Sequence, residues 1–395
     1  TICLTESVER AKPDPMPNFD LSEYLARQAK AQAAIEGAGL DAMLLFAPES
    51  HYWLTGYDTF GFAMFQCMVM TAKGEIQLLT RMPDLRQAQL TSMLSDDQIH
   101  VWPEYEGSNP AEHLLSLLQE MGVAQGKLGF ESNTSGLIDY GQLLRTALPH
   151  LQDHSDLFRA LRRVKSPAEI EMHRKAAKLS DDAMDAGLAK TRAGAFEGDI
   201  LAAMQGAVFE GGGDYAGNEF ILGSGPGALL CRYYSGRRYL ETQDQMTWEW
   251  AGAYARYHAA MMRTVVIGTP SDTQKRMHAA SVEALEACEA AMTPGDPMGN
   301  VYEAHAKVFD RHGLQDARMQ ACGYAMGAVY NPIWVEFPMF YEGNPLLMQA
   351  GQVFFMHMIL MDSDTGLAMC TGHSVLVTET GVERLSRQPL DLLIR

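Results

Sequence analysis

The sequence is poor in cysteine and contains no long hydrophobic run. Its six cysteines are scattered over 395 residues and form no C-x-x-C pair, which argues against a zinc knuckle and against a disulfide framework. No window approaches the roughly 18 uninterrupted apolar residues of a membrane-spanning helix. The first residues also lack a basic segment followed by an apolar run. We therefore expect a cytoplasmic protein without a membrane anchor.

Basic residues are scarce relative to acidic ones. The chain has 31 Lys and Arg against 49 Asp and Glu, which gives a formal net charge of −18. Nucleic acids and anionic membranes are bound through basic patches, so this balance argues against both as partners. Two explanations of the acidity stay open: a salt-stressed cytoplasm, where surface carboxylates maintain solubility, and an ordinary acidic enzyme.

The length and the pattern of elements predict two domains. With 395 residues and an apolar fraction of 47%, the chain is long enough for two sizeable cores. Residues 1–160 alternate between strands and helices, as in an α/β domain. There we expect helices at 21–37 and 84–94, and strands at 42–46, 64–71, 75–80, 100–102 and 127–130.

Residues 161–395 form the second expected domain. Its first helix has a start signal, because Ser166 is suited to cap a helix with Pro167 in the first turn and Glu169 close behind. We expect helices at 169–189, 195–210, 272–291 and 299–312, and strands at 218–224, 246–266, 330–340, 352–361 and 367–378.

The segment Trp248–Thr264 carries the most informative motif. It reads W-E-W-A-G-A-Y-A-R-Y-H-A-A-M-M-R-T, and it resembles the D-x-G-A-x-Y-x-G-Y-x-x-D-x-x-R-T hairpin of the creatinase, prolidase and methionine aminopeptidase superfamily. The resemblance places Glu249 at the family's first metal-binding Asp and Ala260 at the second. One ligand is changed and the other is absent.

Three further frames of the same superfamily follow in the correct order. The frame of its metal-binding His appears as G-Y-A-M-G, which places Tyr324 at that His. The frames of its two metal-binding Glu residues place His357 at one and Gly372 at the other. A dinuclear site needs several carboxylate oxygens, and only Glu249 and His357 retain side chains of a usual ligand type. The resemblance therefore implies a metal-free member without a cofactor.

The resemblance also implies a fold and an assembly. The expected fold is an α/β (α+β) chain in which a creatinase-type N-terminal α/β domain precedes a C-terminal pita-bread domain, a curved antiparallel sheet covered by helices. Family members are usually homodimers in which the N-terminal domain of one chain closes the pocket of the other. In this arrangement Tyr52 is a candidate substrate-binding residue, because it lies in the segment 49–56, which resembles the creatinase segment that reaches the partner's active site. Phe62 is another, because, counted from Gly56, it falls on the position of the substrate-packing Phe of creatinase.

The expected pocket contains one acidic anchor among aromatic residues. Alternation along a strand sends Trp248 and Trp250 to the face opposite Glu249, so the tryptophans are expected in the core. A carboxylate among aromatic rings suits a small delocalised cation, and Arg232 could hold a substrate carboxylate through a bidentate contact. Further substrate-binding candidates are Tyr324, Tyr254, His373 and Glu336.

This combination most resembles the ectoine hydrolases, whose substrate is a small zwitterion with a cyclic amidinium and a carboxylate. Ring opening would give N-acetyl-2,4-diaminobutyrate, and a deacetylase would be a functional partner. We expect Glu249 to attack the amidinium carbon or to deprotonate the attacking water, and His357 to supply or remove protons. Whether hydroxyectoine is used, and which carbon–nitrogen bond breaks, stay open.

Three other interpretations stay open at the level of sequence. The first is another metal-free amidine or guanidine hydrolase of the creatinase type. The second is a non-catalytic pita-bread binding module, although reactive residue types at pocket positions argue against it. The third is a rebuilt mononuclear metal site formed by Glu249, His357 and His373.

Overall fold

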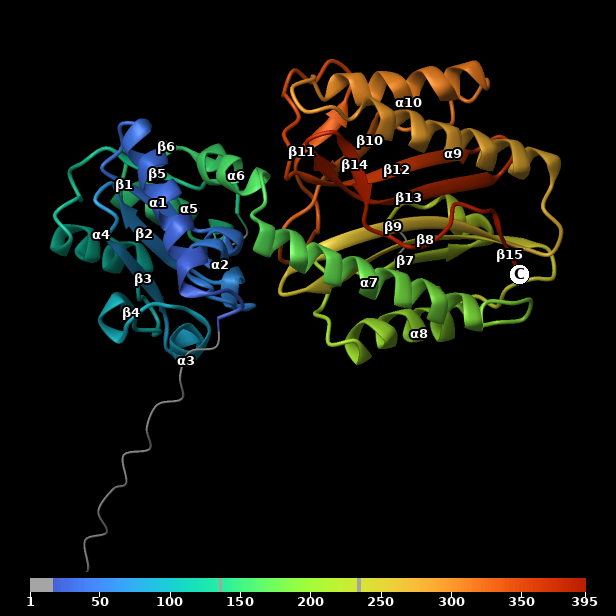
Figure 1. The fold of residues 1–395 in the computed structure, drawn as a ribbon. Helices are drawn as coiled ribbons and strands as arrows, with labels where there is room; N and C mark the ends of the chain where they lie inside the picture. Colours follow the sequence, from blue (N-terminus) through green and yellow to red (C-terminus); the bar gives the residue numbers. More distant parts are fainter. Residues whose placement is uncertain (1–16, 135–136, 233–235) are drawn as a thin grey trace, which may run out of the picture. The chain divides into compact units, whose positions relative to one another are not determined.

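The computed structural model describes residues 17–134, 137–232 and 236–395, and the chain divides into two compact units, Thr1–Leu161 and Arg162–Arg395 (Figure 1). Within the described ranges, no helix is long and apolar enough to cross a bilayer. The fold class expected from the sequence, an α/β unit followed by a helix-covered antiparallel sheet, is confirmed.

Unit 1 is built on a mixed six-stranded sheet with the strand order β4-β3-β2-β1-β5-β6. The central strand β1 is antiparallel to β2 and parallel to β5, and its side chains are buried alternately in two hydrophobic clusters, one on each face. The elements are α1 (Leu21–Gly37), β1 (Ala42–Leu45), α2 (Pro48–Thr55), η1 (Gly61–Ala63), β2 (Cys67–Thr71), β3 (Ile76–Arg81), α3 (Met82–Thr91), η2 (Asp96–Gln98), β4 (Ile99–Trp102), α4 (Pro110–Glu120), β5 (Leu128–Phe130), α5 (Gly141–Ala147), β6 (Gln152–Asp153) and α6 (Ser155–Arg163).

Unit 2 is built on a nine-stranded sheet whose main path is β11-β10-β12-β13-β9-β8-β7, with every neighbour on the path antiparallel. Two short strands lie off this path, β14 beside β13 and β15 beside β9. The elements are α7 (Pro167–Lys190), α8 (Glu197–Glu210), β7 (Ile221–Ser224), η4 (Gly225–Leu229), β8 (Asp244–Tyr254), β9 (Tyr257–Ile267), α9 (Asp272–Ala291), α10 (Gly299–Arg311), β10 (Ala321–Ala325), β11 (Glu336–Tyr341), β12 (Val353–Asp362), β13 (Leu367–Thr378), β14 (Gly381–Arg384) and β15 (Leu393–Ile394).

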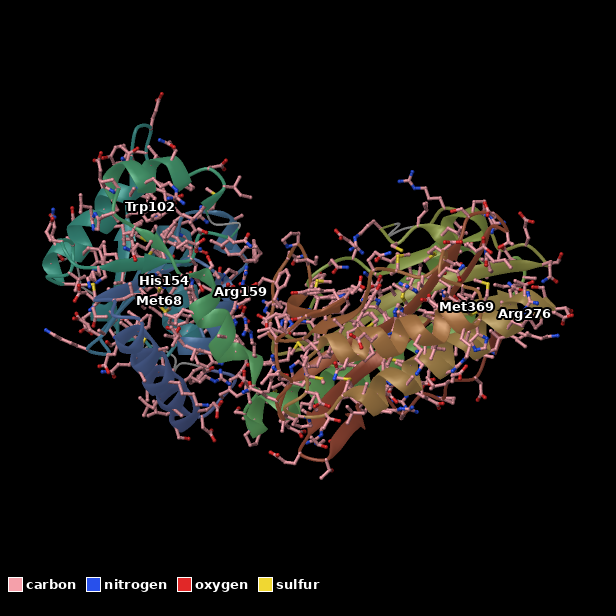
Figure 2. All side chains as sticks on the ribbon, turned by 90° about the horizontal axis from the view of Figure 1, so that it is seen from above. Met68, Trp102, His154, Arg159, Arg276 and Met369 are labelled. Carbon is pink, nitrogen blue, oxygen red and sulfur yellow. The ribbon has the colours of Figure 1, made fainter. Side chains whose placement is uncertain are left out.

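Two pairs of helices cover the sheet of unit 2. The pair α7 and α8 packs on β8, β9 and β7, whereas α9 and α10 pack on β12, β13, β10 and β11 (Figure 1). In Figure 2, Met369 of β13 belongs to the buried cluster beneath α9, while Arg276 lies on the exposed side of that helix. The helices thus bury one face of the sheet and leave the other face to form a cavity.

Local sequence signals explain the ends of the elements that carry the site. Ser166 caps α7 through a reciprocal capping box with Glu169, as expected. The expected strand 246–266 is a hairpin, because Ala255 and Arg256 both adopt positive φ angles, of 49° and 65°, and reverse the chain between β8 and β9. The strand expected at 330–340 begins only at Glu336, and β10 was not expected as a separate strand.

Candidate active site

The two faces of β8 separate the tryptophans from the acid. The indole Nε1 of Trp250 donates to the main-chain oxygen of Ser180 on α7, 2.9 Å away, and Trp248 contacts Gly187 of the same helix. Glu249 lies on the opposite face of the strand, and its side chain lines a cavity. The expectation that alternation sends the tryptophans to the core and Glu249 to the cavity is confirmed.

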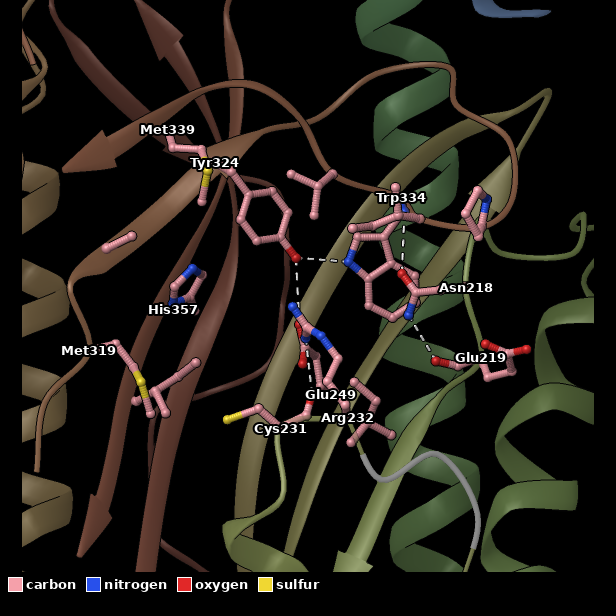
Figure 3. Close-up of a pocket in the computed structure, with 16 residues that line it drawn as sticks. Asn218, Glu219, Cys231, Arg232, Glu249, Met319, Tyr324, Trp334, Met339 and His357 are labelled. Carbon is pink, nitrogen blue, oxygen red and sulfur yellow. Dashed lines mark hydrogen bonds between the residues drawn. The ribbon is translucent and has the colours of Figure 1, made fainter. Parts of the chain in front are cut away.

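The cavity has a volume of about 340 Å³ and lies in unit 2. This size is at the lower end of the range of small-molecule sites. Side chains from both halves of the sheet meet there (Figure 3). The polar residues of its lining include Glu249 of β8, Cys231 and Arg232 after η4, Tyr324 of β10, His357 of β12, and Trp334 in the loop before β11. The apolar residues include Met319, Ala321, Met339 and Ile359.

Glu249 is a buried acid with little compensation. Its side chain is only 6% exposed, and burial raises its pKa to about 7, although the positive charge of Arg232 and the hydroxyl of Tyr324 lower it in part. The Glu249 carboxyl therefore changes its protonation state close to neutral pH. A carboxyl group in this range is suited to accept and release a proton during a reaction.

Arg232 supplies positive charge at the same end of the cavity. The residue is exposed, and its Nη1 donates to the carbonyl oxygen of Cys231 at 3.0 Å. The remaining N–H groups can form a two-point contact with a carboxylate, which a lysine could not. An acid and a cation therefore lie together in a cavity whose lining also includes many apolar side chains.

Tyr324 lies between Glu249 and Trp334. Its hydroxyl accepts a hydrogen bond from the indole Nε1 of Trp334 at 2.8 Å and lies 3.5 Å from Oε1 of Glu249 (Figure 3). The second distance is long for a hydrogen bond between oxygens, as is common at catalytic sites without ligand. Burial, and then the charge of Glu249, raise the pKa of Tyr324 well above its usual value, so the phenol stays protonated.

His357 faces the cavity from β12. Burial lowers its pKa to about 4, so the imidazole is neutral at pH 7. Its Nδ1 is buried and has no hydrogen-bond partner in the described part of the chain, and its ring lies 5.5 Å from that of Tyr324. Of the two expected roles, accepting a proton or hydrogen bond fits a neutral imidazole, whereas donating a proton as imidazolium does not.

Three sequence-based candidates, His373, Glu336 and Tyr254, do not line this cavity, so the structure does not bring them together with Glu249. His373 follows Gly372 on β13 and points to the helix side, where Nε2 lies 2.7 Å from Oε1 of Glu289 on α9. Glu336 forms ion pairs with Arg162 and Lys165 at the start of unit 2. Tyr254 shares the helix-facing side of β8 with Trp250, and the Nζ of Lys175 lies 4.8 Å from its ring centroid.

The two candidates of unit 1 have different settings. Tyr52 is fully buried, and its hydroxyl accepts a hydrogen bond from Asn18 at 3.0 Å, which gives it a structural role within unit 1. Phe62 lies partly exposed in η1. The expectation that this segment closes a partner's pocket in a homodimer stays a prediction.

The residues at the expected ligand positions do not fit a dinuclear metal centre. Glu249, Tyr324 and His357 do meet in the cavity, but Ala260 offers no ligand atom. A Cβ at Gly372 would collide with the main-chain oxygen of Met356, so this position has no space for a side chain. Among the residues that the structure describes, no group of three or more His, Cys, Asp or Glu side chains could hold a metal ion.

Comparison with protein families identifies the second unit. The profile of metallopeptidase family M24 matches residues 171–379, more than half of the chain. The chain belongs to metallopeptidase family M24. The profile of the creatinase/prolidase N-terminal domain matches residues 27–164 of this M24 member.

Individual relatives of this M24 member carry different activities in their names. The ectoine hydrolase of Halomonas elongata is 29% identical over 95% of this chain and 98% of its own length. The Xaa-Pro dipeptidase of Pyrococcus furiosus is 22% identical over 60% of this chain and 67% of its own. The crystal structure of dipeptidase PepE from Mycobacterium ulcerans superimposes with a TM-score of 0.83 at 25% identity, over 95% of this chain and 99% of that one.

Several cavity residues were not among the sequence-based candidates. Trp334 lies in the loop before β11, where no periodic pattern predicts the direction of a side chain. Asn218 and Glu219 precede β7 and close the cavity near Trp334. Cys231 could have been found from its place directly before the candidate Arg232 in the sequence.

Proposed function

We propose that this protein is a hydrolase that opens the cyclic amidinium ring of ectoine to N-acetyl-2,4-diaminobutyrate without a metal ion. The observation that carries the proposal is the buried Glu249 carboxyl, with a pKa of about 7, in a small cavity beside Arg232. The similarity to an ectoine hydrolase over 95% of the chain supports the same substrate.

The charges of the cavity match those of such a zwitterion. The amidinium is a flat, delocalised cation that pairs with the Glu249 carboxylate, while the substrate carboxylate on the adjacent ring carbon pairs with Arg232. The ring methyl and methylene groups then face the apolar lining formed by Met319, Met339 and Ile359. Both charges of the substrate lie close together, as do Glu249 and Arg232.

The reaction adds one water across the amidinium carbon and breaks one ring carbon–nitrogen bond. In the general-base route, the Glu249 carboxylate takes a proton from water as the oxygen attacks carbon, and Glu249 returns that proton to the leaving nitrogen. The proton of the resulting hydroxyl also passes to the leaving nitrogen, which departs as an ammonium group and leaves an acetamide. The neutral His357 accepts a hydrogen bond from the hydroxyl of the tetrahedral intermediate.

In the covalent route, an oxygen of Glu249 forms a bond to the amidinium carbon, and one ring carbon–nitrogen bond then breaks as a proton passes from the retained nitrogen to the leaving amine. The ring-opened substrate stays attached to Glu249 until water attacks the same carbon, which breaks the bond to the Glu249 oxygen and releases the acetamide and the carboxylate. The two routes differ in one observable: only the covalent route adds the mass of the substrate to the protein. Mass spectrometry of protein quenched in acid during turnover distinguishes them.

The test of the proposal is proton NMR of ectoine incubated with chelator-treated protein. We expect the ring methyl signal to be replaced by an acetyl singlet. A Xaa-Pro dipeptide with added Mn²⁺ serves as the control substrate, since other relatives carry peptidase names. Unchanged ectoine with folded protein would refute the proposal, and creatine-like substrates would be tested next.

The proposed product also defines the functional surroundings of the enzyme. An N-acetylated diamino acid is a substrate for a deacetylase, so a deacetylase stays the expected functional partner.

Size-exclusion chromatography with light scattering tests the expected homodimer, for which a mass of about twice the 43.6 kDa chain is predicted.

A further inference from the structure

The Tyr324 hydroxyl is enclosed by two groups with different hydrogen-bonding capacities. Trp334 Nε1 lies 2.8 Å from the hydroxyl oxygen, and Glu249 Oε1 lies 3.5 Å from it. All three side chains are buried. Figure 3 shows the hydroxyl directed at the space between the indole and the carboxyl group.

The chemistry of the indole fixes the direction of the hydrogen bonds that join Trp334, Tyr324 and Glu249. An indole N–H only donates, so the hydroxyl oxygen of Tyr324 must accept from Trp334. A hydroxyl has one hydrogen, and with the Trp334 side occupied by a donor this hydrogen is directed toward the Glu249 side. Accepting a hydrogen bond also makes the hydroxyl a stronger donor.

Trp334 is itself held in place by the opposite half of the unit. Its main-chain N–H donates to Oδ1 of Asn218 at 3.2 Å. The neighbouring Gly217 approaches the Trp334 main chain so closely that a Cβ at Gly217 would lie 3.1 Å from its Cα. The N–H of Gly217 donates to Nε2 of the buried His258 at 2.8 Å. The main chain of Trp334, which carries the indole, is therefore anchored by contacts that do not involve Glu249.

We propose that Trp334 is a positioning residue, which directs the Tyr324 hydroxyl hydrogen toward the Glu249 carboxylate. The importance of this for turnover rests on the proposed function, whereas the hydrogen-bond direction does not. Once a substrate separates the two oxygens, the same hydrogen points to the reacting centre. Trp334 thus acts on Glu249 only through Tyr324.

Other titratable or charged groups surround Glu249, and they define the control for this proposal. Arg232 and Cys231 approach from the segment after η4, Cys370 from β13 and His357 from β12. Of all the groups that face Glu249, only Tyr324 is hydrogen-bonded to Trp334 in the described part of the chain. A Trp334 substitution should therefore have no effect on Glu249 once the Tyr324 hydroxyl is absent.

The experiment is an NMR titration of protein labelled with carboxyl-¹³C glutamate, in which the Glu249 signal is assigned by its loss in Glu249→Gln. Tyr324→Phe should raise the pKa of Glu249 by about one unit, because a hydrogen bond to a charged group is lost. Trp334→Phe should raise it by a smaller amount, about half a unit. The double variant should match Tyr324→Phe alone.

Two results would overturn the proposal: an unchanged Glu249 pKa in Trp334→Phe, or an equal further shift when Trp334→Phe is added to Tyr324→Phe. If Trp334→Phe fails to fold, benzothienylalanine at position 334 keeps the shape and removes only the N–H. With ectoine, the rising limb of the kcat/KM profile should move by the same amount. If ectoine is not hydrolysed, the proposed function fails, while the titration still decides the role of Trp334.

Discussion

In unit 2 a buried glutamate and a buried histidine lie on each face of the sheet, Glu289 with His373 on the helix side and Glu249 with His357 on the cavity side, and the two sets have opposite properties. On the helix side, Glu289 accepts hydrogen bonds from His373 at 2.7 Å and from Nε of Arg384 at 3.0 Å. On the cavity side, Glu249 has the Tyr324 hydroxyl at 3.5 Å, and Nδ1 of His357 has no partner among the described residues. The same residue types are thus saturated in one place and unsaturated in the other.

The pKa values of the two glutamates follow from this difference. Burial raises the pKa of both, but at Glu289 the hydrogen bonds from His373 and Arg384 outweigh burial and bring its pKa below the usual value. At Glu249 burial prevails and the pKa rises to about 7. A saturated pair stabilises a fold, whereas unsaturated groups that face a cavity remain available to a ligand. The comparison therefore distinguishes the candidate active-site residues Glu249 and His357 from Glu289 and His373, which are the same residue types in a structural ion pair.

The largest expected effect distinguishes the two glutamates by activity. Glu249→Gln should lower kcat for ectoine by about 10³-fold or more, since the group that takes the proton from water is lost. Glu289→Gln is the matched control and should retain the wild-type kcat, because it lies on the other face of the sheet. Steady-state NMR assays at pH 8 measure both. Equal losses in the two variants would contradict the assignment of the site.

The second effect is the pH dependence of the reaction. Because the Glu249 carboxylate is the reactive form and its pKa is about 7, kcat/KM should be level above that pH and fall about tenfold per unit below it. The loss at pH 5 should be about 100-fold. A profile that rises toward acidic pH would instead make Glu249 a proton donor in the rate-limiting step.

The third effect is on stability: at pH 8, Glu249→Gln should raise the free energy of unfolding and Glu289→Gln should lower it. Glu249 has a folded pKa of about 7, above its usual 4.5, so the folded state loses stability as pH rises between these values, and Glu249→Gln removes this loss. Glu289 has a pKa below its usual 4.5, so its carboxylate stabilises the folded state at every pH above that usual pKa. Glu289→Gln should therefore lower the free energy of unfolding by about 2 kcal/mol at pH 8. Urea unfolding at pH 8 and pH 5 measures both; the same sign for both variants would refute the comparison.

The period of a strand is sufficient to place some of these residues from sequence. Alternation along β8 alone separates Glu249 from Trp248 and Trp250. The same rule, applied to β13, would have placed His373 on the face opposite to that of its neighbour Gly372, and therefore on the helix side of the sheet. The family frames were informative about position, and the strand period about direction.

Other features depend on contacts between distant segments, and no local pattern could reveal them. Glu336 is held by Arg162, which is 174 residues away in sequence. The main chain of Trp334 is held by the side chain of Asn218, which is 116 residues away in sequence. The fold class was therefore predictable from motifs and periodicity, whereas the hydrogen-bond chain that supports Glu249 required the structure.

The smallest expected effect concerns metal removal, and it is the test that most directly separates this site from a metal-dependent one. Ala260 and Gly372 remove two of the expected ligands, and Gly372 has no space for a replacement side chain. Treatment with EDTA, followed by exchange into metal-free buffer, should therefore change kcat for ectoine by less than about twofold. Elemental analysis of the same sample verifies the removal. A loss of activity that added Mn²⁺ or Zn²⁺ restores would show that Glu249 and His357 act as metal ligands, and the general-base role of Glu249 would then be wrong.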